Sequence, residues 1–225
     1  MQNINFIDWS EIRYAEALER QTEIFNRKVK EKIEGSSSVS QDFILCEHNN
    51  VYTIGKHGKE SNMLVSGEFL KKIDAEVFKI NRGGDITYHG RGQITGYPSL
   101  DLDALNLGIR DYIFLLEEMV IKTMSEYQIS CSRLEGATGV WIDAHTKKAR
   151  KICAIGVKVS RGITMHGFAL NVNTDLTYFN YINPCGFVDK GVTSMAKELI
   201  GEVNIQEVKQ RLYKNFSELI NKNIK

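Results

Sequence analysis

Three helical patterns, separated by two clusters of strand-like segments, constrain the fold of this chain more than any other feature. Apolar side chains recur at helical spacing over residues 14–33, and a second amphipathic face covers residues 109–127. The first pattern ends near Gly35, just before three serines. Asn204 followed by Glu207 predicts a capping box at the start of a last helix.

Short runs of β-branched residues fill the intervals between these helices, and glycine, asparagine or charged residues separate them. The predicted strands cover residues 43–46, 51–54, 77–80, 86–89, 94–97, 140–142, 152–159 and 163–172, and a short helix is expected at 196–200. Helices that alternate with strand clusters predict an α/β (α+β) fold in which helices flank a mixed β-sheet. We expect residues 1–225 to form a single domain, since neither a repeat nor a second boundary is visible.

The charge balance and the cysteines argue against several classes of protein. The chain has 29 lysines and arginines against 28 aspartates and glutamates, so no nucleic-acid partner is expected. No run approaches the ~20 apolar residues that span a bilayer, so no membrane partner is expected. Four widely spaced cysteines argue against a disulfide framework and suit a reducing compartment, which predicts a cytoplasmic protein. The five histidines show no metal-ligand spacing, so no metal is expected.

The segment from Arg82 to Gly96 contains five glycines. Glycine allows a positive φ and a close approach of the backbone to a ligand. Tight turns between strands would explain the glycines, but turns do not require the polar and aromatic side chains of Thr87, Tyr88 and His89 between them. This composition favours a loop that cradles a ligand.

Nucleotide-binding motifs fail in this chain. Residues 90–96 place the last glycine one residue too far for the dinucleotide fingerprint. Val192 stands where a P-loop over residues 186–193 needs a lysine. Neither ATP nor NAD is supported, and no cofactor is expected.

Cys185 lies in a constrained turn and is the candidate nucleophile. Pro184 fixes its own φ and Gly186 permits an unusual turn, so this thiol is better placed for exposure than one inside a strand. A buried core thiol is the alternative. The thiolate is the reactive form, and a nearby ammonium would favour it. Lys151, at the start of an apolar strand, is either that ammonium or a solvated strand end, and spacing alone does not bring it to Cys185.

A basic run surrounds this lysine. Its members are Lys147, Lys148, Arg150, Lys151, Lys158 and Arg161. They form either a solvated rim or a docking surface for an acidic protein partner.

Together these residues resemble the lipoyl(octanoyl) transferase family, in order from about residue 43 to residue 200. The matching phrases are Glu47-His48, residues 51–55, residues 82–93, Tyr97-Pro98, and residues 139–141, 151–157, 166–172 and 184–186. Two positions depart from the family pattern. Arg91 stands where proline is usual, and Gly162 stands where an aromatic residue is usual.

The resemblance implies a fold like that of the biotin and lipoate protein ligases. It implies an acyltransferase that moves an octanoyl group from octanoyl-acyl carrier protein to a lysine of lipoyl domains, in 2-oxoacid dehydrogenases and in the glycine cleavage H protein. It puts the acyl thioester on Cys185 and assigns the lowering of that thiol's pKa to Lys151. It puts substrate binding at Arg82, Gly83, Gly84, Asp85, Ile86, Thr87, Tyr88, His89, Ala154, Ile155, Gly156, Gly167, Phe168 and Ala169.

Several alternatives remain open. An ATP-dependent lipoate ligase on the same fold would need no nucleophilic cysteine. A lipoyl or octanoyl amidotransferase would use the same cysteine chemistry on another donor. A non-catalytic acyl-carrier-binding module would keep the pocket without the chemistry. Cys153 is a lesser candidate nucleophile, because the period of two along a strand puts its side chain on the same face as Lys151.

Overall fold

Two β-sheets and five α-helices make up the part of the chain that the computed structural model describes, which is residues 3–35, 39–183 and 190–223. The helices are α1 (Tyr14–Ile33), α2 (Gly67–Lys72), α3 (Ile109–Glu126), α4 (Met195–Leu199) and α5 (Ile205–Asn223), and the short 3-10 helices are η1 (Glu60–Asn62) and η2 (Leu176–Tyr181). The strands are β1 (Ile4–Glu11), β2 (Gln41–Glu47), β3 (Val51–Ile54), β4 (Glu76–Lys79), β5 (Ile86–His89), β6 (Gln93–Ser99), β7 (Ser132–Leu134), β8 (Ala137–Ile142), β9 (Arg150–Ser160), β10 (Ile163–Asn171) and β11 (Gly191–Val192).

The larger sheet is mixed. Its strands follow the order β1-β2-β6-β10-β9-β8-β7, and β11 also pairs with β9. β1 is parallel to β2 and β11 is parallel to β9, whereas the other neighbours are antiparallel. The smaller sheet has the order β4-β3-β5. The predicted mixed sheet flanked by helices is confirmed.

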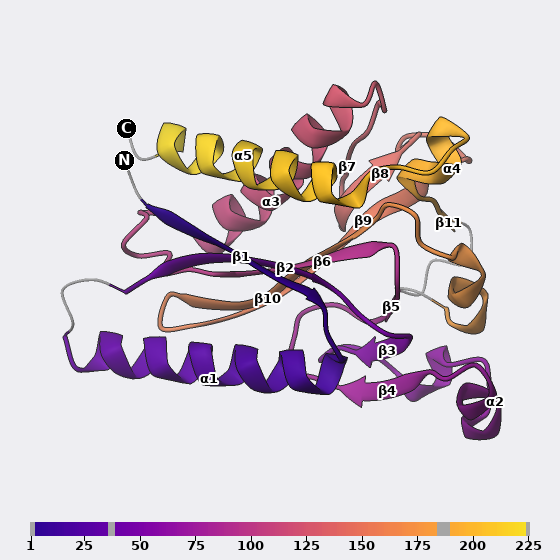
Figure 1. The fold of residues 1–225 in the computed structure, drawn as a ribbon, viewed down its shortest axis with the longest axis horizontal. Helices are drawn as coiled ribbons and strands as arrows, with labels where there is room; N and C mark the ends of the chain where they lie inside the picture. The colour runs from indigo at the N-terminus through magenta and orange to yellow at the C-terminus, as the bar shows by residue number, and fades with distance from the viewer. Residues whose placement is uncertain (1–2, 36–38, 184–189, 224–225) are drawn as a thin grey trace.

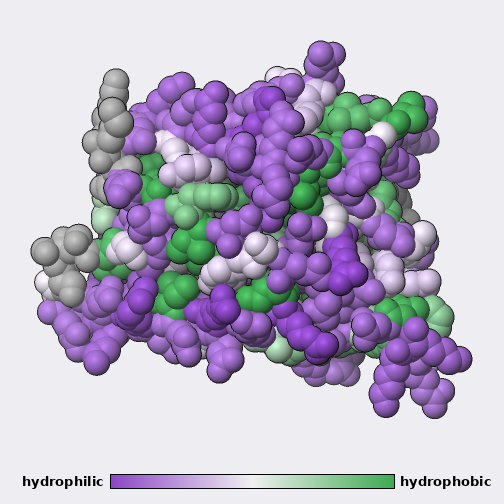
Figure 2. Space-filling view, in the orientation of Figure 1, coloured by the Kyte–Doolittle hydropathy of each residue, from purple (hydrophilic) through white to green (hydrophobic). Residues whose placement is uncertain are grey.

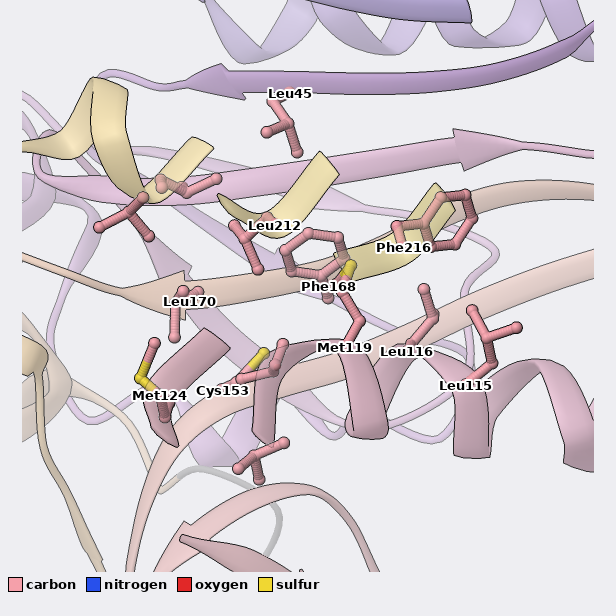
Figure 3. Packing of buried hydrophobic residues seen from close by; sticks show 14 of the residues in the cluster. Leu45, Leu115, Leu116, Met119, Met124, Cys153, Phe168, Leu170, Leu212 and Phe216 are labelled. Atoms are coloured by element: carbon pink, nitrogen blue, oxygen red, sulfur yellow. The ribbon is translucent and has the colours of Figure 1, made fainter. Parts of the chain in front are cut away.

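Helices cover both faces of the larger sheet, with α3 and α5 on one face and α1 on the other (Figure 1). The outward side of α1 is hydrophilic (Figure 2). The main core fills the opposite face of the sheet, where Met119 of α3 and Leu212 and Phe216 of α5 meet Phe168 of β10 (Figure 3). Burying each such side chain stabilises the fold by about 1.5–3 kcal/mol, so this layer holds the long strands β9 and β10 in place.

A second, smaller core holds the three-stranded sheet against η2. Tyr88 of β5 stacks on Tyr178 of η2 with ring centroids 4.7 Å apart, and its hydroxyl donates to Asn50 Oδ1 at 2.7 Å. The hydroxyl of Tyr52 donates to the carbonyl oxygen of Tyr178 at 2.9 Å. These contacts fix the chain just before Asn183.

Every predicted helix and strand is present, with ends that differ by a few residues. Asn204 Oδ1 accepts the backbone N–H groups of Gln206 and Glu207 at 3.0 and 3.2 Å, which confirms it as the N-cap of α5. The sequence did not predict β1, α2, β7 or β11. Only Ile4 of β1 and only Leu70 of α2 are buried, so neither element carries a clear hydrophobic period.

A β-bulge between β8 and β9 changes which side chains of β9 face inward. Val140 pairs with Cys153 and Trp141 pairs with Lys151, so Ile152 is the extra residue. Cys153 is fully buried in the main core (Figure 3), whereas Lys151 lines a pocket on the other side. The expectation that Lys151 and Cys153 share a face is therefore wrong, because strand alternation holds only in an uninterrupted ladder.

Candidate active site

A pocket of about 430 Å³ is lined by strands of both sheets. Its volume lies within the range of about 300–1,000 Å³ that is usual for small-molecule sites. It brings together the three predicted segments, which are the loop and strand at 82–89, β9 and β10. The predicted residues that line it are Arg82, Gly84, Asp85, Ile86, Thr87, His89, Lys151, Ala154, Ile155, Gly156, Gly167, Phe168 and Ala169.

Small residues face each other across β9 and β10 at this pocket. Gly156 pairs with Gly167, and Ala154 pairs with Ala169. Both pairs line the pocket. Because side chains alternate along a strand, Phe168 between them packs its ring into the main core, although the residue also belongs to the pocket lining. The two strands thus present a wall with few protruding atoms, which suits an extended apolar chain.

Gly83 and Tyr88 do not line the pocket, although the resemblance puts them at the substrate. Gly83 donates its backbone N–H to the carbonyl oxygen of Val157 at 2.9 Å, which holds the loop on β9. Tyr88 points into the smaller core, while its neighbours Thr87 and His89 reach the pocket.

Arg82 brings a largely buried positive charge to the pocket wall. Its Nη2 donates to the carbonyl oxygen of Thr53 at 2.7 Å and to the Thr53 hydroxyl at 2.9 Å. Gly156 of β9 lies against it. A Cβ at position 156 would stand 2.7 Å from the carbonyl oxygen of Gly83 and 3.2 Å from Arg82 Cδ. Only glycine at this position lets the loop close onto β9 without displacement.

A chain of hydrogen bonds orients His89 and fixes its tautomer. Gln93 Nε2 donates to the carbonyl oxygen of Tyr88 at 3.1 Å and to Asn171 Oδ1 at 2.9 Å, which leaves Gln93 Oε1 as an acceptor. His89 Nδ1, 2.9 Å from that oxygen, is therefore the donor. His89 Nε2 accepts from the Thr53 hydroxyl at 3.2 Å. Because both ring nitrogens are bonded, His89 shapes the wall of the pocket.

Burial keeps three histidines neutral around the site, since it penalises the charged form. Burial, with the nearby His48 and Arg82, lowers the pKa of His89 to about 3. Burial, with the charges of Arg82 and Lys158, lowers the pKa of His166 to about 3. Burial also lowers the pKa of His48 to about 4. These three rings are uncharged at neutral pH, whereas Arg82 and Lys151 bring positive charge to the pocket wall.

Lys151 is the second residue of β9 and lines the pocket. Its Nζ donates to the carbonyl oxygen of Thr138 at 3.1 Å and lies 4.6 Å from the ring centroid of Trp141. Gly139 has a φ of +123°, and a Cβ there would stand 3.4 Å from Lys151 Cε. The same Cβ would stand 2.5 Å from the carbonyl oxygen of Cys153, so the positive φ and the close approach of β9 both require glycine at this position.

The three described cysteines are poor nucleophiles. Burial raises the pKa of the Cys46 thiol and that of the Cys153 thiol well above their usual range. Burial raises the pKa of the Cys131 thiol to about 12. Because the thiolate is the reactive form, none of these three is activated.

Cys185 lies outside the described residues, but the chain just before it is placed. Asn183 donates its backbone N–H to the carbonyl oxygen of Asn62 at 2.8 Å. Asn62 Nδ2 in turn donates to Asp85 Oδ2 at 2.6 Å. Asn183, the last described residue before this gap, is therefore tied to the glycine-rich side of the pocket.

The chain after residue 189 is tied to the lysine side. Val192 pairs with Lys151, and Thr193 donates its backbone N–H to the carbonyl oxygen of Lys151 at 3.0 Å. Arg150 donates to both carboxylate oxygens of Glu198 at 2.7 and 2.6 Å, and Glu198 accepts the Thr193 hydroxyl at 2.5 Å. The two described ends of this connection thus adjoin the two halves of the predicted site.

Further residues complete the pocket wall without having been singled out as site residues from the sequence. They include Tyr14, His57, Gln93, Thr95, Tyr97, Trp141, His166, Asn171, Phe179 and Lys190. They come from many different elements and share no motif. Asn171 meets Gln93 because the two residues are opposite each other in the β10–β6 register. The one sequence feature that could have identified some of them as pocket residues is the family resemblance, because several of them lie in its matching phrases.

The predicted basic run does not form one surface. Lys151 lines the pocket, and Lys158 Nζ lies 4.5 Å from the ring centroid of Phe25 on α1. The 11 residues of β9 separate Lys148 from Arg161, a span of about 36 Å at ~3.3 Å per residue. The docking prediction is therefore confined to the exposed pair Lys147 and Lys148.

Both family departures have local explanations. Arg91 is exposed and pairs with Glu11 at 2.7 Å, away from the pocket lining. Gly162 has a φ of +75° in the β9–β10 turn, a conformation that favours glycine.

Among residues 3–35, 39–183 and 190–223, no three His, Cys, Asp or Glu side chains are placed to hold a metal ion. In the same ranges, no helix is both long and apolar enough to cross a bilayer.

Comparison with known proteins assigns the chain to a family. The model of the lipoyl protein ligase A/B catalytic domain matches residues 13–217. Octanoyltransferase from Bacteroides thetaiotaomicron is 55% identical over 215 residues, covering 96% of this chain and 94% of that protein. The chain belongs to the lipoyl(octanoyl) transferase family. Octanoyltransferase from Parabacteroides distasonis is 53% identical over 220 residues, covering 97% of this chain and 99% of the relative. This member of the lipoyl(octanoyl) transferase family is an acyltransferase.

Solved structures with low sequence identity share the fold of this lipoyl(octanoyl) transferase family member. A bi-partite lipoate protein ligase from Thermoplasma acidophilum has a TM-score of 0.70 at 17% identity, covering 97% of this chain and 85% of the other. Biotin protein ligase from Aquifex aeolicus has a TM-score of 0.51 at 13% identity, covering 99% and 70%. The expected biotin and lipoate protein ligase-like fold is confirmed.

Proposed function

We propose that this transferase moves an octanoyl group from octanoyl-acyl carrier protein to a lysine of lipoyl domains in lipoate biosynthesis. The acceptors are the lipoyl domains of 2-oxoacid dehydrogenases and the glycine cleavage H protein. Relatives at 53–55% identity that are named octanoyltransferases support the choice of acyl group. We propose that residues 1–225 act as one catalytic domain in the cytoplasm, where thiols stay reduced.

The observation that carries the proposed nucleophile is the attachment of the chain on both sides of residues 184–189. Cys185 is two residues from Asn183, a reach of about 7 Å at most. Asn183 is bonded to the Asn62 backbone, and Val192 pairs with Lys151. The two-residue connection to Asn183 and the return of the chain to Lys151 at Val192 support a Cys185 thiol that meets the Lys151 ammonium at the pocket.

The proposed reaction has two acyl transfers. In the first, the Cys185 thiolate attacks the carbonyl carbon of the octanoyl thioester, and the carbon–sulfur bond to the carrier breaks. The leaving thiolate takes a proton from the Lys151 ammonium, which until then has stabilised the Cys185 thiolate. An enzyme-bound octanoyl thioester and a neutral lysine remain.

In the second transfer, the amine of the acceptor lysine attacks the acyl-enzyme carbonyl. A carbon–nitrogen bond forms, the bond to Cys185 breaks, and Lys151 accepts the proton that the amine loses. The small residues Ala154, Gly156, Gly167 and Ala169 are the proposed bed for the octanoyl chain, since they leave an unobstructed apolar wall.

A choice of donors tests this proposal against its rivals. With octanoyl-acyl carrier protein and a lipoyl domain, but no ATP, the chain should octanoylate the acceptor lysine. Transfer from octanoic acid that needs ATP would identify a ligase instead. Transfer from an octanoyl-lipoyl domain with none from the carrier would identify an amidotransferase, and no transfer from any donor would leave a binding module.

A further inference from the structure

Two apolar side chains project from the end of α4. Leu199 is 41% exposed and Ile200 is 94% exposed. A hydrophobic patch covers this helix in the space-filling view (Figure 2). Ile200 also has a left-handed backbone, with φ +54° and ψ +44°. Such a conformation strains a β-branched residue, and glycine normally occupies this position after a helix. An exposed, strained isoleucine does nothing for the core, so it points to a function at the surface.

Exposed lysines lie on two elements near this patch, together with one exposed carboxylate, that of Glu202. Lys197 is exposed on α4, and Lys147 and Lys148 are exposed on the turn before β9. Arg150 connects the two elements, because it donates to Glu198 of α4 and to the carbonyl oxygen of Lys148. An apolar centre with a basic rim is complementary to an acidic protein surface that presents an apolar side chain.

The patch lies beside the pocket opening rather than over it. Among the described residues, those of Met195–Leu199 do not line the pocket, whereas Lys190, Gly191 and Val192 just before them do. Gly191 donates its backbone N–H to the carbonyl oxygen of Ala149 at 3.0 Å, so the turn with Lys148 adjoins the same opening. A partner whose reacting group is a short side chain must cover the opening itself. A partner that carries its acyl group on a long flexible arm can dock to one side.

We infer that Leu199 and Ile200, with the rim of Lys147, Lys148 and Lys197, dock the acidic body of the acyl-carrier donor while its arm delivers the thioester to the pocket. The inference rests on the proposed function and deepens it, since it assigns the donor a surface separate from the site of chemistry. The lipoyl-domain acceptor, or a second copy of this chain, would be a different occupant.

Ile200→Gly tests the inference without weakening the fold. Glycine removes the apolar side chain and relieves the left-handed strain, so the thermal midpoint should equal or exceed that of the parent. Steady-state octanoyl transfer is measured with the donor varied at saturating acceptor, and with the acceptor varied at saturating donor. The KM for octanoyl-carrier should rise roughly fivefold or more, as expected for loss of an interface anchor. The rate with octanoyl-pantetheine, which has no protein body, should stay unchanged.

Ile33→Ser is the matched control, because Ile33 is 61% exposed at the far end of α1 from α4 (Figure 1). It should leave the donor KM unchanged. An unchanged donor KM in Ile200→Gly would overturn the docking surface, and so would a rise confined to the KM of the acceptor. If Ile200→Gly abolished a dimer in sedimentation and left the donor KM unchanged, the patch would be an interface between two copies of this chain instead. If the parent is acylated by neither donor, the proposed function itself fails and the docking inference fails with it.

Discussion

The ammonium of Lys151 lies 4.6 Å from the ring centroid of Trp141. This contact and the hydrogen bond to Thr138 hold the cation at the pocket wall, on the opposite side of the strand from Cys153. The bulge at Ile152 produces this separation. The cation is therefore directed away from the buried thiol and toward the side where Val192 brings the chain back.

Removing this cation should change the chemistry of Cys185 while the fold persists. In Lys151→Ala, the pKa of the Cys185 thiol should rise, because the charge that favours the thiolate is gone. The rate of alkylation against pH should then have its midpoint at a higher pH than in the parent. Lys151→Arg should keep the parental midpoint but slow the transfer to the acceptor, since arginine cannot accept a proton at neutral pH. An alkylation midpoint that does not move in Lys151→Ala would remove Lys151 from the mechanism.

The loop that carries Arg82 should depend on glycine at position 156. Gly156→Ala places a Cβ 2.7 Å from the carbonyl oxygen of Gly83, so the loop must move away from β9. We expect octanoyl transfer to fall by at least tenfold, about 1.4 kcal/mol in the activation free energy, because the pocket wall is displaced. Gly67→Ala is the control, since a Cβ there meets nothing within 4 Å. Similar activity of Gly156→Ala and Gly67→Ala would show that the loop does not shape the site.

The fold could be predicted largely from the sequence because long amphipathic helices and buried strands carry strong periods. Helix 109–127 buries one face from Tyr112 to Met124, and its pattern is visible without the structure. β1 carries no such pattern, since it pairs with β2 along only one edge and buries Ile4 alone. No sequence pattern predicts a bulge such as that at Ile152. The bulge moves the side chains that follow it to the opposite face of the sheet from the one that simple alternation predicts.

The protein should lose stability between pH 7.5 and pH 5. The pKa values of His48, His89 and His166 are about 4, 3 and 3, below the unfolded value of about 6.5. Below about pH 6.5 the unfolded chain therefore binds more protons than the folded protein does. The free energy of unfolding decreases as the pH falls. Each histidine should lower the free energy of unfolding at pH 5 by about 1–2 kcal/mol relative to pH 7.5. Urea unfolding at both pH values measures this, and an equal free energy of unfolding at pH 7.5 and pH 5 would show that these rings are not held neutral.

The exposed lysines next to β9 should contribute to donor binding through charge. Reversing Lys147 and Lys148 to glutamate should raise the KM for octanoyl-carrier at low ionic strength, and added salt should shrink the difference from the parent, because exposed charges are screened. Reversing Lys71 and Lys72, an exposed pair on α2, is the matched control and should have little effect. If the two double variants behave alike, the lysines before β9 form only a solvated rim.

The sequence and its family resemblance identified much of the candidate site, but not how it is assembled. Arg82, His89, Lys151 and Gly156 all line the pocket. Tyr88 was assigned to the substrate because the family resemblance maps substrate binding onto the whole run from Arg82 to His89, yet strand alternation turns it into the smaller core. The hydrogen bond between Gln93 and Asn171 joins residues 78 positions apart, so only the sheet register reveals it.

Intact-mass analysis of the enzyme after incubation with octanoyl-carrier alone tests the central claim most directly. The parent should gain one octanoyl group that hydroxylamine removes and that a lipoyl domain consumes, because a covalent intermediate must be both formed and used. Cys153→Ala should acylate like the parent, since that thiol is buried in the core, whereas Cys185→Ser should form little or no labile adduct. An adduct that persists in Cys185→Ser and disappears in Cys153→Ala would move the nucleophile to Cys153. Sustained turnover with no adduct in the parent would contradict the thioester mechanism altogether.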